Sequence, residues 1–299
     1  FLKQKIMKKI ISKILLTLII SINFIEMDKA TAIVPYYYMP SGQVLEKNSS
    51  LFADRAYYLL SIGRLDEGLQ LAKLALSFDQ SNEKLWAILA EAQIRNNLFK
   101  DALETIKKGK SLNSENSDFY FVESSIYLQN KKLKKARKTL ESGLKIDPKN
   151  SFALFQLGNI FLMEKNYKEA LKTFERAVKI KSNFWEVINN IGLAYYELDE
   201  EYFAEINFNR AISINRNGET LLALAVTLQN KDPEQSILLS KEALKLNPSF
   251  VSLEYREEQL WGEKIQKATQ QLFKSQELEN DIDLAREYLK ITNNQILTN

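Results

Sequence analysis

Hydrophobic and small positions along residues 49–250 follow a pattern that repeats every 34 residues. Large residues fill one position of the repeat: Trp86, Tyr120, Leu154 and Ile188. Small residues recur at three others without a slip. These are Ala56, Ala90, Ser124, Gly158 and Gly192; then Gly68, Ala102, Ala136, Ala170 and Ala204; then Ala75, Gly109, Gly143, Ala177 and Ala211. A period of this length predicts stacked pairs of antiparallel helices, because helices approach closely only where side chains are small.

The lattice and its lapses predict how the chain is divided. Only nine glycines and five prolines in 299 residues also favour helix over short strands. The sixth unit fits the lattice if one residue is deleted before Asp232-Pro233. The expected repeats lie near 49–82, 83–116, 117–150, 151–184, 185–217 and 218–250. Before them, residues 33–48 hold two prolines and three tyrosines and are expected as an extended linker. After them, we expect a capping helix over 251–275 and a helical tail with a frayed end over 276–299.

One unit shows the full pattern of a known repeat. Leu157-Gly158, Phe161, Tyr167, Ala170, Phe174 and Ala177 resemble the tetratricopeptide-repeat (TPR) family. Ile191-Gly192, Tyr195, Ala204, Phe208 and Ala211 repeat the resemblance, which covers residues 49 to about 250. It implies an all-α fold: a right-handed superhelical solenoid of about six helix–turn–helix repeats with a C-terminal capping helix.

The same resemblance implies where a ligand would bind. In this family the first helix of each repeat lines a concave groove. The matching positions that we predict as the peptide-binding groove are Phe121, Phe152, Phe155, Asn159, Met163, Asn189, Asn190, Leu193 and Tyr196. Aromatic rings supply buried area and amides pair with a peptide backbone, so the set suits an extended peptide.

Asn159 and Asn190 occupy positions where chaperone-binding relatives hold a ligand backbone. Those relatives also carry basic residues that grip a C-terminal carboxylate, but here the matching positions are Phe155, Thr220 and Leu224. We therefore expect recognition of an internal segment. The alternative is that both asparagines satisfy local polar groups.

The N-terminus has the features of an export signal. Lys8, Lys9 and Lys13 precede a charge-free, mostly apolar run from Ile14 to Ile25, and the small-x-small sequence Ala30-Thr31-Ala32 follows. The run is shorter than the roughly 20 residues of a membrane-spanning helix, so we expect cleavage after Ala32. An uncleaved anchor is the alternative, and Met7 is expected as the true start.

Composition excludes several classes of chemistry. The chain has no cysteine and no histidine, which removes disulfides, thiolate nucleophiles and Cys/His zinc sites. Without residues 1–32 it holds 35 basic and 36 acidic residues, which does not support nucleic-acid binding. The Lys-rich run over 131–138 is expected to be a solvated surface, with peripheral contact to an anionic membrane as the alternative. No cofactor motif is present, and we expect none.

Three further stretches narrow the resemblance. Residues 33–40, Phe184 to Leu193, and Glu258 to Gly262 are similar to an exported TPR protein of photosynthetic bacteria. That similarity implies the periplasm or thylakoid lumen. The expected function is a non-catalytic scaffold or assembly factor that binds a protein or extended peptide and is monomeric when free. A structural subunit of a stable envelope or thylakoid complex is the first alternative, and an enzyme with carboxylate chemistry is the second.

Overall fold

A computed structural model describes residues 42–298, and every regular element in that range is helical. The expected signal over 1–32, its cleavage site and the linker up to residue 41 lie outside the described residues. None of the described helices is long and apolar enough to span a membrane.

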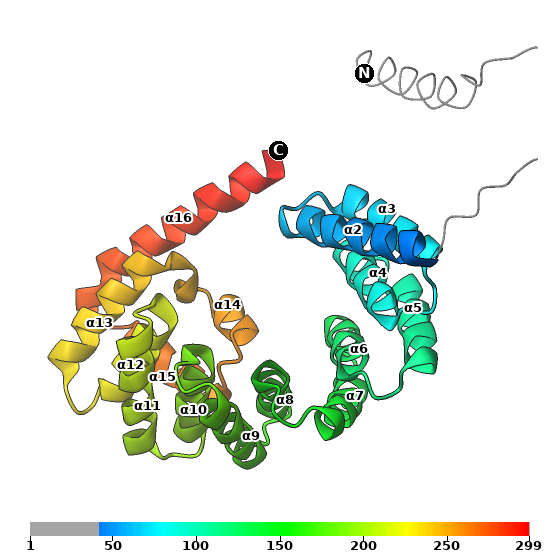
Figure 1. The fold of residues 1–299 in the computed structure, drawn as a ribbon. Coiled ribbons are helices and arrows are strands. Elements are labelled where there is room, and N and C mark those ends of the chain that lie inside the picture. The colour runs from blue at the N-terminus through cyan, green and yellow to red at the C-terminus, as the bar shows by residue number, and fades with distance from the viewer. Residues whose placement is uncertain (1–41, 299) are drawn as a thin grey trace, which may run out of the picture. The chain divides into compact units, whose positions relative to one another are not determined.

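Six helix pairs follow one another in a curved row (Figure 1). The first helices of the pairs are α2 (Gly42–Ser61), α4 (Glu83–Arg95), α6 (Ser117–Gln129), α8 (Ser151–Met163), α10 (Trp185–Glu197) and α12 (Gly218–Leu228). The second helices are α3 (Leu65–Phe78), α5 (Phe99–Leu112), α7 (Leu133–Ile146), α9 (Tyr167–Ile180), α11 (Glu201–Ile214) and α13 (Pro233–Leu246). The first helices lie on the inner side of the row, so the predicted solenoid of helical repeats is confirmed.

The 34-residue lattice positions the contacts between helices. All fifteen small residues are buried. At Gly158 a Cβ would lie 2.2 Å from a ring carbon of Phe174, so the two helices of this pair meet where only glycine fits. Buried apolar side chains form successive clusters along the row, each shared between neighbouring helix pairs, as expected of a solenoid whose single hairpins cannot bury their apolar faces.

Two polar features recur with the same period. Asn82, Asn116 and Asn150 each precede a first helix and accept a hydrogen bond from a backbone N–H in its first turn. In the first five pairs, the turn between the two helices contains one residue with φ between 56° and 80°: Gly63, Asn97, Lys131, Lys165 and Asp199. The asparagines mark where first helices begin, and the positive-φ residues lie just after first helices end. Equivalent helices therefore begin and end at equivalent positions of the 34-residue repeat.

The ends of the chain differ from expectation. Residues 42–48, assigned from sequence to the linker, are the first turns of α2. Residues 251–275, expected as one capping helix, include α14 (Leu253–Glu258) and α15 (Glu263–Leu272), with a break at Leu260, whose φ is 65°. A short 3-10 helix, Pro248–Val251, precedes them, and another, Gln276–Leu278, leads into α16 (Glu279–Thr298).

The last helix pair is covered by α16 on one side. Helix α16 packs on α13, with Leu278, Ile282 and Ala285 buried in the same cluster as the α12 side chains. Helix α15 instead contacts α10 and α12. The C-terminal residues thus close the row and also return to its inner face.

Candidate peptide-binding groove

The predicted groove residues lie on the first helices, and the structure divides them into two groups. On α8, Phe152, Phe155, Asn159 and Met163 are spaced along one side of the helix. Phe152 is 59% exposed and Met163 is 47% exposed. We call the inner face of α4, α6 and α8 the open stretch.

Aromatic rings gather at the centre of the open stretch. The Phe155 ring centroid lies 6.3 Å from that of Phe152, 6.3 Å from that of Phe174 and 5.2 Å from that of Phe184. Phe155 is half-buried, so one part of its ring packs in the core and another faces the surface beside Phe152. Phe121 on α6 is also half-buried. The arrangement offers a partner apolar area on a rigid support.

The second group is buried. Asn189, Asn190, Leu193 and Tyr196 on α10 are between 1% and 8% exposed. They lie on the inner face of α10, which α15 contacts together with α12. We call the inner face of α10 and α12 the covered stretch, and residues 259–272 the covering segment.

The asparagines link three repeats. The Nδ2 of Asn190 donates to the Oδ1 of Asn159 over 2.8 Å, and the Nδ2 of Asn189 donates to Glu219 over 2.8 Å. Asn159 and Asn190 are therefore in contact, and in this state the amide of Asn190 donates to that of Asn159. A role in holding a ligand backbone stays a prediction.

Glu197, the last residue of α10, holds the start of α15. Its Oε1 accepts hydrogen bonds from the backbone N–H groups of Lys264 and Ile265, both at 3.0 Å. Gly262 precedes α15 and provides no side-chain cap. A carboxylate at a helix N-terminus meets unpaired N–H groups and the positive end of the helix dipole, so Glu197 caps α15 from another helix.

Burial changes the acidity of groups around the covered stretch. Removal from water raises the pKa of Glu219 to about 7, although Asn189 and Trp261 act in the opposite direction. Burial, followed by the charge of Glu197, raises the pKa of Tyr167 to about 12. Tyr196 has its pKa raised to about 12 mainly by burial. The covered stretch is thus a low-dielectric environment with a carboxyl group inside it.

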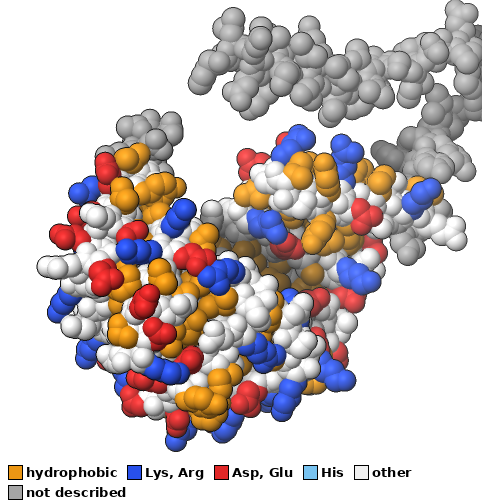
Figure 2. All heavy atoms as spheres, turned by 90° about the vertical axis from the view of Figure 1, so that its left-hand side faces the viewer, with side chains coloured by type: hydrophobic (Ala, Val, Ile, Leu, Met, Phe, Trp, Pro, Cys, Tyr) orange, Lys and Arg blue, Asp and Glu red, His pale blue; other side chains and the backbone are white. Residues whose placement is uncertain are grey.

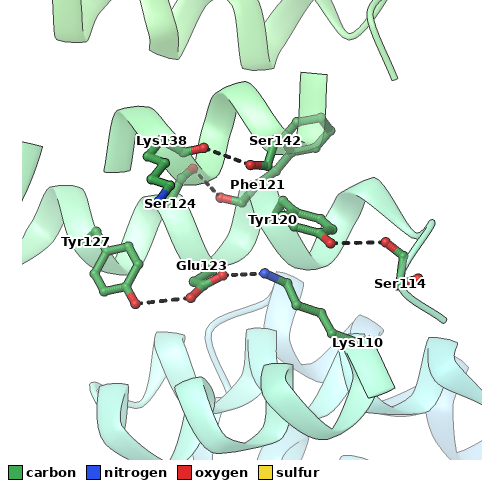
Figure 3. A network of polar contacts seen from close by, with 9 residues as sticks. All are labelled: Lys110, Ser114, Tyr120, Phe121, Glu123, Ser124, Tyr127, Lys138 and Ser142. Atoms are coloured by element: carbon green, nitrogen blue, oxygen red, sulfur yellow. Dashed lines mark hydrogen bonds and ion pairs between the residues drawn. The ribbon is translucent and has the colours of Figure 1, made fainter. Parts of the chain in front are cut away.

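The contact between the second and third repeats includes a polar network beside its apolar cluster (Figure 3). Glu123 on α6 accepts from the Lys110 ammonium and from the Tyr127 hydroxyl, the latter over 3.1 Å. Burial, with Glu123 adding to it, raises the pKa of Tyr127. The Lys110 nitrogen also lies 3.7 Å from the centroid of the Tyr120 ring. Polar groups thus connect neighbouring repeats next to the open stretch.

One sequence signal could have revealed the covered stretch. Helix α12 reads Gly-Glu-Thr-Leu-Leu-Ala-Leu-Ala-Val-Thr-Leu, with apolar residues on every side. A helix that is apolar all round is buried all round, so its inner side needed a cover. The covering residues themselves carry no such local signal.

No group of three or more Asp and Glu residues in the described part of the chain is placed to hold a metal ion.

Figure 2 shows the molecule hollowed between its N-terminal and C-terminal repeats, with apolar side chains along much of the hollow. On the outer face in the same view, charged side chains of both signs separate small apolar groups.

Comparison with known proteins agrees with this architecture. Profiles of the tetratricopeptide repeat match residues 117–150 and 151–184, which form the helix pairs α6–α7 and α8–α9. The two matched segments are consecutive, and they support the family expected from the sequence. The search of curated proteins found no match.

Two solved structures resemble the fold. One, from the functional characterization of Pseudomonas aeruginosa pilF, has a TM-score of 0.64 at 20% identity, over 72% of this chain and 98% of that chain. Another, the APC/C hetero-tetramer Cut9–Hcn1, has a TM-score of 0.59 at 16% identity, over 76% of this chain and 44% of that chain. At these identities the likeness shows the fold alone.

Proposed function

We propose that this chain is a non-catalytic scaffold or assembly factor that acts outside the cytoplasmic membrane and holds an internal, extended segment of another protein. The binding surface is the open stretch, centred on Phe152, Phe155 and Met163. The observation that carries the proposal is the exposure of Phe152 and Met163 beside the half-buried Phe155 ring. Large apolar side chains grouped in a hollow are typical of a protein-binding surface.

The chemistry of the site supports an internal segment over a free C-terminus. Arg95 on α4 is already paired with Glu91 over 3.1 Å, and the positions that would grip a carboxylate hold Phe155, Thr220 and Leu224. Action outside the membrane, in the periplasm or thylakoid lumen, is supported by the basic and apolar N-terminal residues alone.

A photocrosslinking experiment tests the binding surface. A benzophenone amino acid at Phe152 replaces one exposed ring by another, and the matched control carries it at Leu238 of α13, which is 57% exposed. We expect an envelope protein to crosslink from position 152 and not from position 238. A synthetic peptide of the crosslinked segment should bind the purified chain, and the double variant Phe152→Ala, Met163→Ala should weaken that binding at least about tenfold.

Two results would contradict the proposal. The first is crosslinking from position 238 only. The second is a crosslinked segment whose peptide binds the double variant as tightly as the unmodified chain.

One observation favours the alternative of a structural subunit. On α11, Tyr202 is 68% exposed and lies beside the exposed Phe203, with ring centroids 5.5 Å apart; Ile206 adds to the same face. A permanent subunit would cover such a patch. A purified chain that remains a soluble monomer on size exclusion would argue against this alternative, whereas aggregation relieved by Tyr202→Lys and Ile206→Lys would favour it.

A further inference from the structure

The covering segment occupies the inner face of the solenoid in the manner of a ligand. Helix α15 contacts α10 and α12, and Leu260 packs against the cluster formed by α7 to α10. Trp261 is only 4% exposed and joins the α12 side chains. In Figure 1, α14 lies inside the curve of the row, where this segment begins its return.

Specific groups of the repeats recognise the segment. Glu197 caps the first N–H groups of α15, and a Cβ on Gly262 would lie 2.3 Å from the carboxyl carbon of Glu197. Ile265, Thr269 and Leu272 share one face of α15 and are buried. Lys165 and Asp199, from two neighbouring hairpin turns, form ion pairs with Glu263 and Lys264. These groups of the repeats, which we call the seat, therefore select a Leu-Trp pair, then a glycine, then an amphipathic helix.

The fit of the segment is incomplete. In the described part of the chain, two buried side-chain atoms of this region, Asn189 Oδ1 and Gln266 Nε2, have no hydrogen-bond partner. Leu260 adopts φ 65°, which is rare for a residue with a side chain. Glu219 is half-buried and accepts a hydrogen bond from Asn189, and removal from water raises the pKa of its carboxyl group to about 7. Unpaired polar groups and backbone strain lower the free energy needed to lift the segment away.

We propose that the covered stretch is a second peptide-binding surface, occupied in the free protein by residues 259–272 and taken over by a partner segment of the same chemistry. That partner segment has a Leu-Trp pair, then a glycine that begins an amphipathic helix. The proposal extends the proposed function from the open stretch to α10 and α12. The chain's own segment defines the occupant, because its contacts specify each of these features.

The test supplies the segment as a separate molecule. A fluorescein-labelled peptide of residues 257–274 is titrated into the unmodified chain and into Gly262→Ala, and its anisotropy is measured. The alanine methyl group displaces the Glu197 carboxylate from the N–H groups of Lys264 and Ile265 and so weakens the hold on the chain's own segment, while every other residue that contacts the segment remains. We expect the peptide to bind Gly262→Ala at least about tenfold more tightly than the unmodified chain, because the internal competitor has lost its cap from Glu197.

Matched controls isolate the recognition. A peptide that itself carries Gly262→Ala should not bind either chain. The chain variant Lys267→Ala alters an exposed residue of α15 and should behave as the unmodified chain. Hydrogen exchange should show α15 amides less protected in Gly262→Ala, with α8 and α10 amides unchanged, which verifies folding. The chain variant Trp261→Ala weakens the hold on the chain's own segment by removing its buried ring. It should bind the peptide as tightly as Gly262→Ala does.

Three outcomes would overturn the proposal. Equal peptide binding to the unmodified chain and to Gly262→Ala is one, and equal binding of the two peptides is another. An unmodified chain that forms dimers by exchanging this segment is the third, because the occupant would then be a second copy. None of these results depends on the open stretch, so this proposal and the proposed function can fail separately.

Discussion

The open and covered stretches of the inner face have the same scaffold and different surroundings. Met163 ends α8 and Glu197 ends α10, at equivalent positions 34 residues apart. Met163 is 47% exposed, whereas Glu197 is 6% exposed and holds the start of α15. Phe155 and Asn189 are equivalent in the same way, and only Asn189 is fully covered.

This difference separates two kinds of information in the sequence. The small-residue lattice builds the helix pairs in both stretches and does not depend on what covers them. The residues between lattice positions decide whether the inner face remains a surface or becomes an interior. A repeat pattern therefore predicts a groove without predicting that the groove is empty.

The largest expected effect concerns the lattice that both stretches share. Gly158→Leu and Gly192→Leu each place a side chain where a Cβ alone would lie 2.2 Å and 2.5 Å from a phenylalanine ring. Overpacking should cost about 3 kcal/mol in the free energy of unfolding at either site. Urea titrations monitored by circular dichroism measure both free energies of unfolding. A value for either variant equal to that of the unmodified chain would contradict the packing account.

The next effect is a pH dependence of the free energy of unfolding, which arises from Glu219 in the covered stretch. Glu219 has a folded-state pKa of about 7 against an ordinary value of 4.5, so the folded chain binds the proton more tightly. Its stabilisation is complete below pH 4.5 and is lost as the pH rises to 7, which corresponds to about 2–3 kcal/mol. Glu219→Gln should remove this part of the decline between pH 5 and pH 8 and stabilise the chain at pH 8.

The control for the pH experiment is Glu258→Gln, which alters an exposed carboxyl group in the same part of the molecule. It should leave the decline in place. A Glu219→Gln chain whose stability falls with pH as steeply as that of the unmodified chain would show that Glu219 is not enclosed.

A pair of equivalent positions gives a smaller contrast. Glu197→Ala removes the acceptor for two N–H groups of α15 and should cost about 2 kcal/mol. Met163→Ala truncates a half-exposed side chain and should cost less than about 1 kcal/mol. Thermal melts of the two variants would contradict the contrast if Met163→Ala proved the more destabilising.

The smallest effect tests the turns. Lys131 has φ 56° in a turn where Gly63 occupies the equivalent position of the first repeat. Lys131→Gly relieves the left-handed strain and should stabilise the chain by about 0.5 kcal/mol net of the added freedom of the unfolded state. Lys132→Gly, one residue later at φ −92°, should destabilise it instead. The same sign for both variants in urea titrations would contradict this reading.

Much of the fold could be predicted from the sequence, because its determinants are local and periodic. Residues such as Ala90, Ser124 and Gly158 mark each pair, and the deletion before Pro233 was visible as a shift in the lattice. The ends were harder. Nothing periodic identified residues 42–48 as helical, and the break at Leu260 depends on a backbone conformation that leucine rarely adopts.

The covered stretch could not be predicted from spacing, since its contacts join residues far apart in the chain. Glu197 and Lys264 are 67 residues apart, and neither position is unusual for a surface charge. The positions of the groove residues came from the family resemblance, which places them on the first helices but says nothing of a returning segment. The apolar sequence of α12 was the available sign that its inner side needed a cover.

The most direct test of the contrast between the two stretches uses thiol reactivity, because the chain contains no cysteine. Single variants Met163→Cys and Leu193→Cys place a thiol on the open and on the covered stretch, and their rates of reaction with a maleimide are compared under native conditions. We predict that the thiol at 193 reacts at least about tenfold more slowly, and that adding Gly262→Ala removes most of the difference. Equal rates at the two positions in the otherwise unmodified chain would contradict the account.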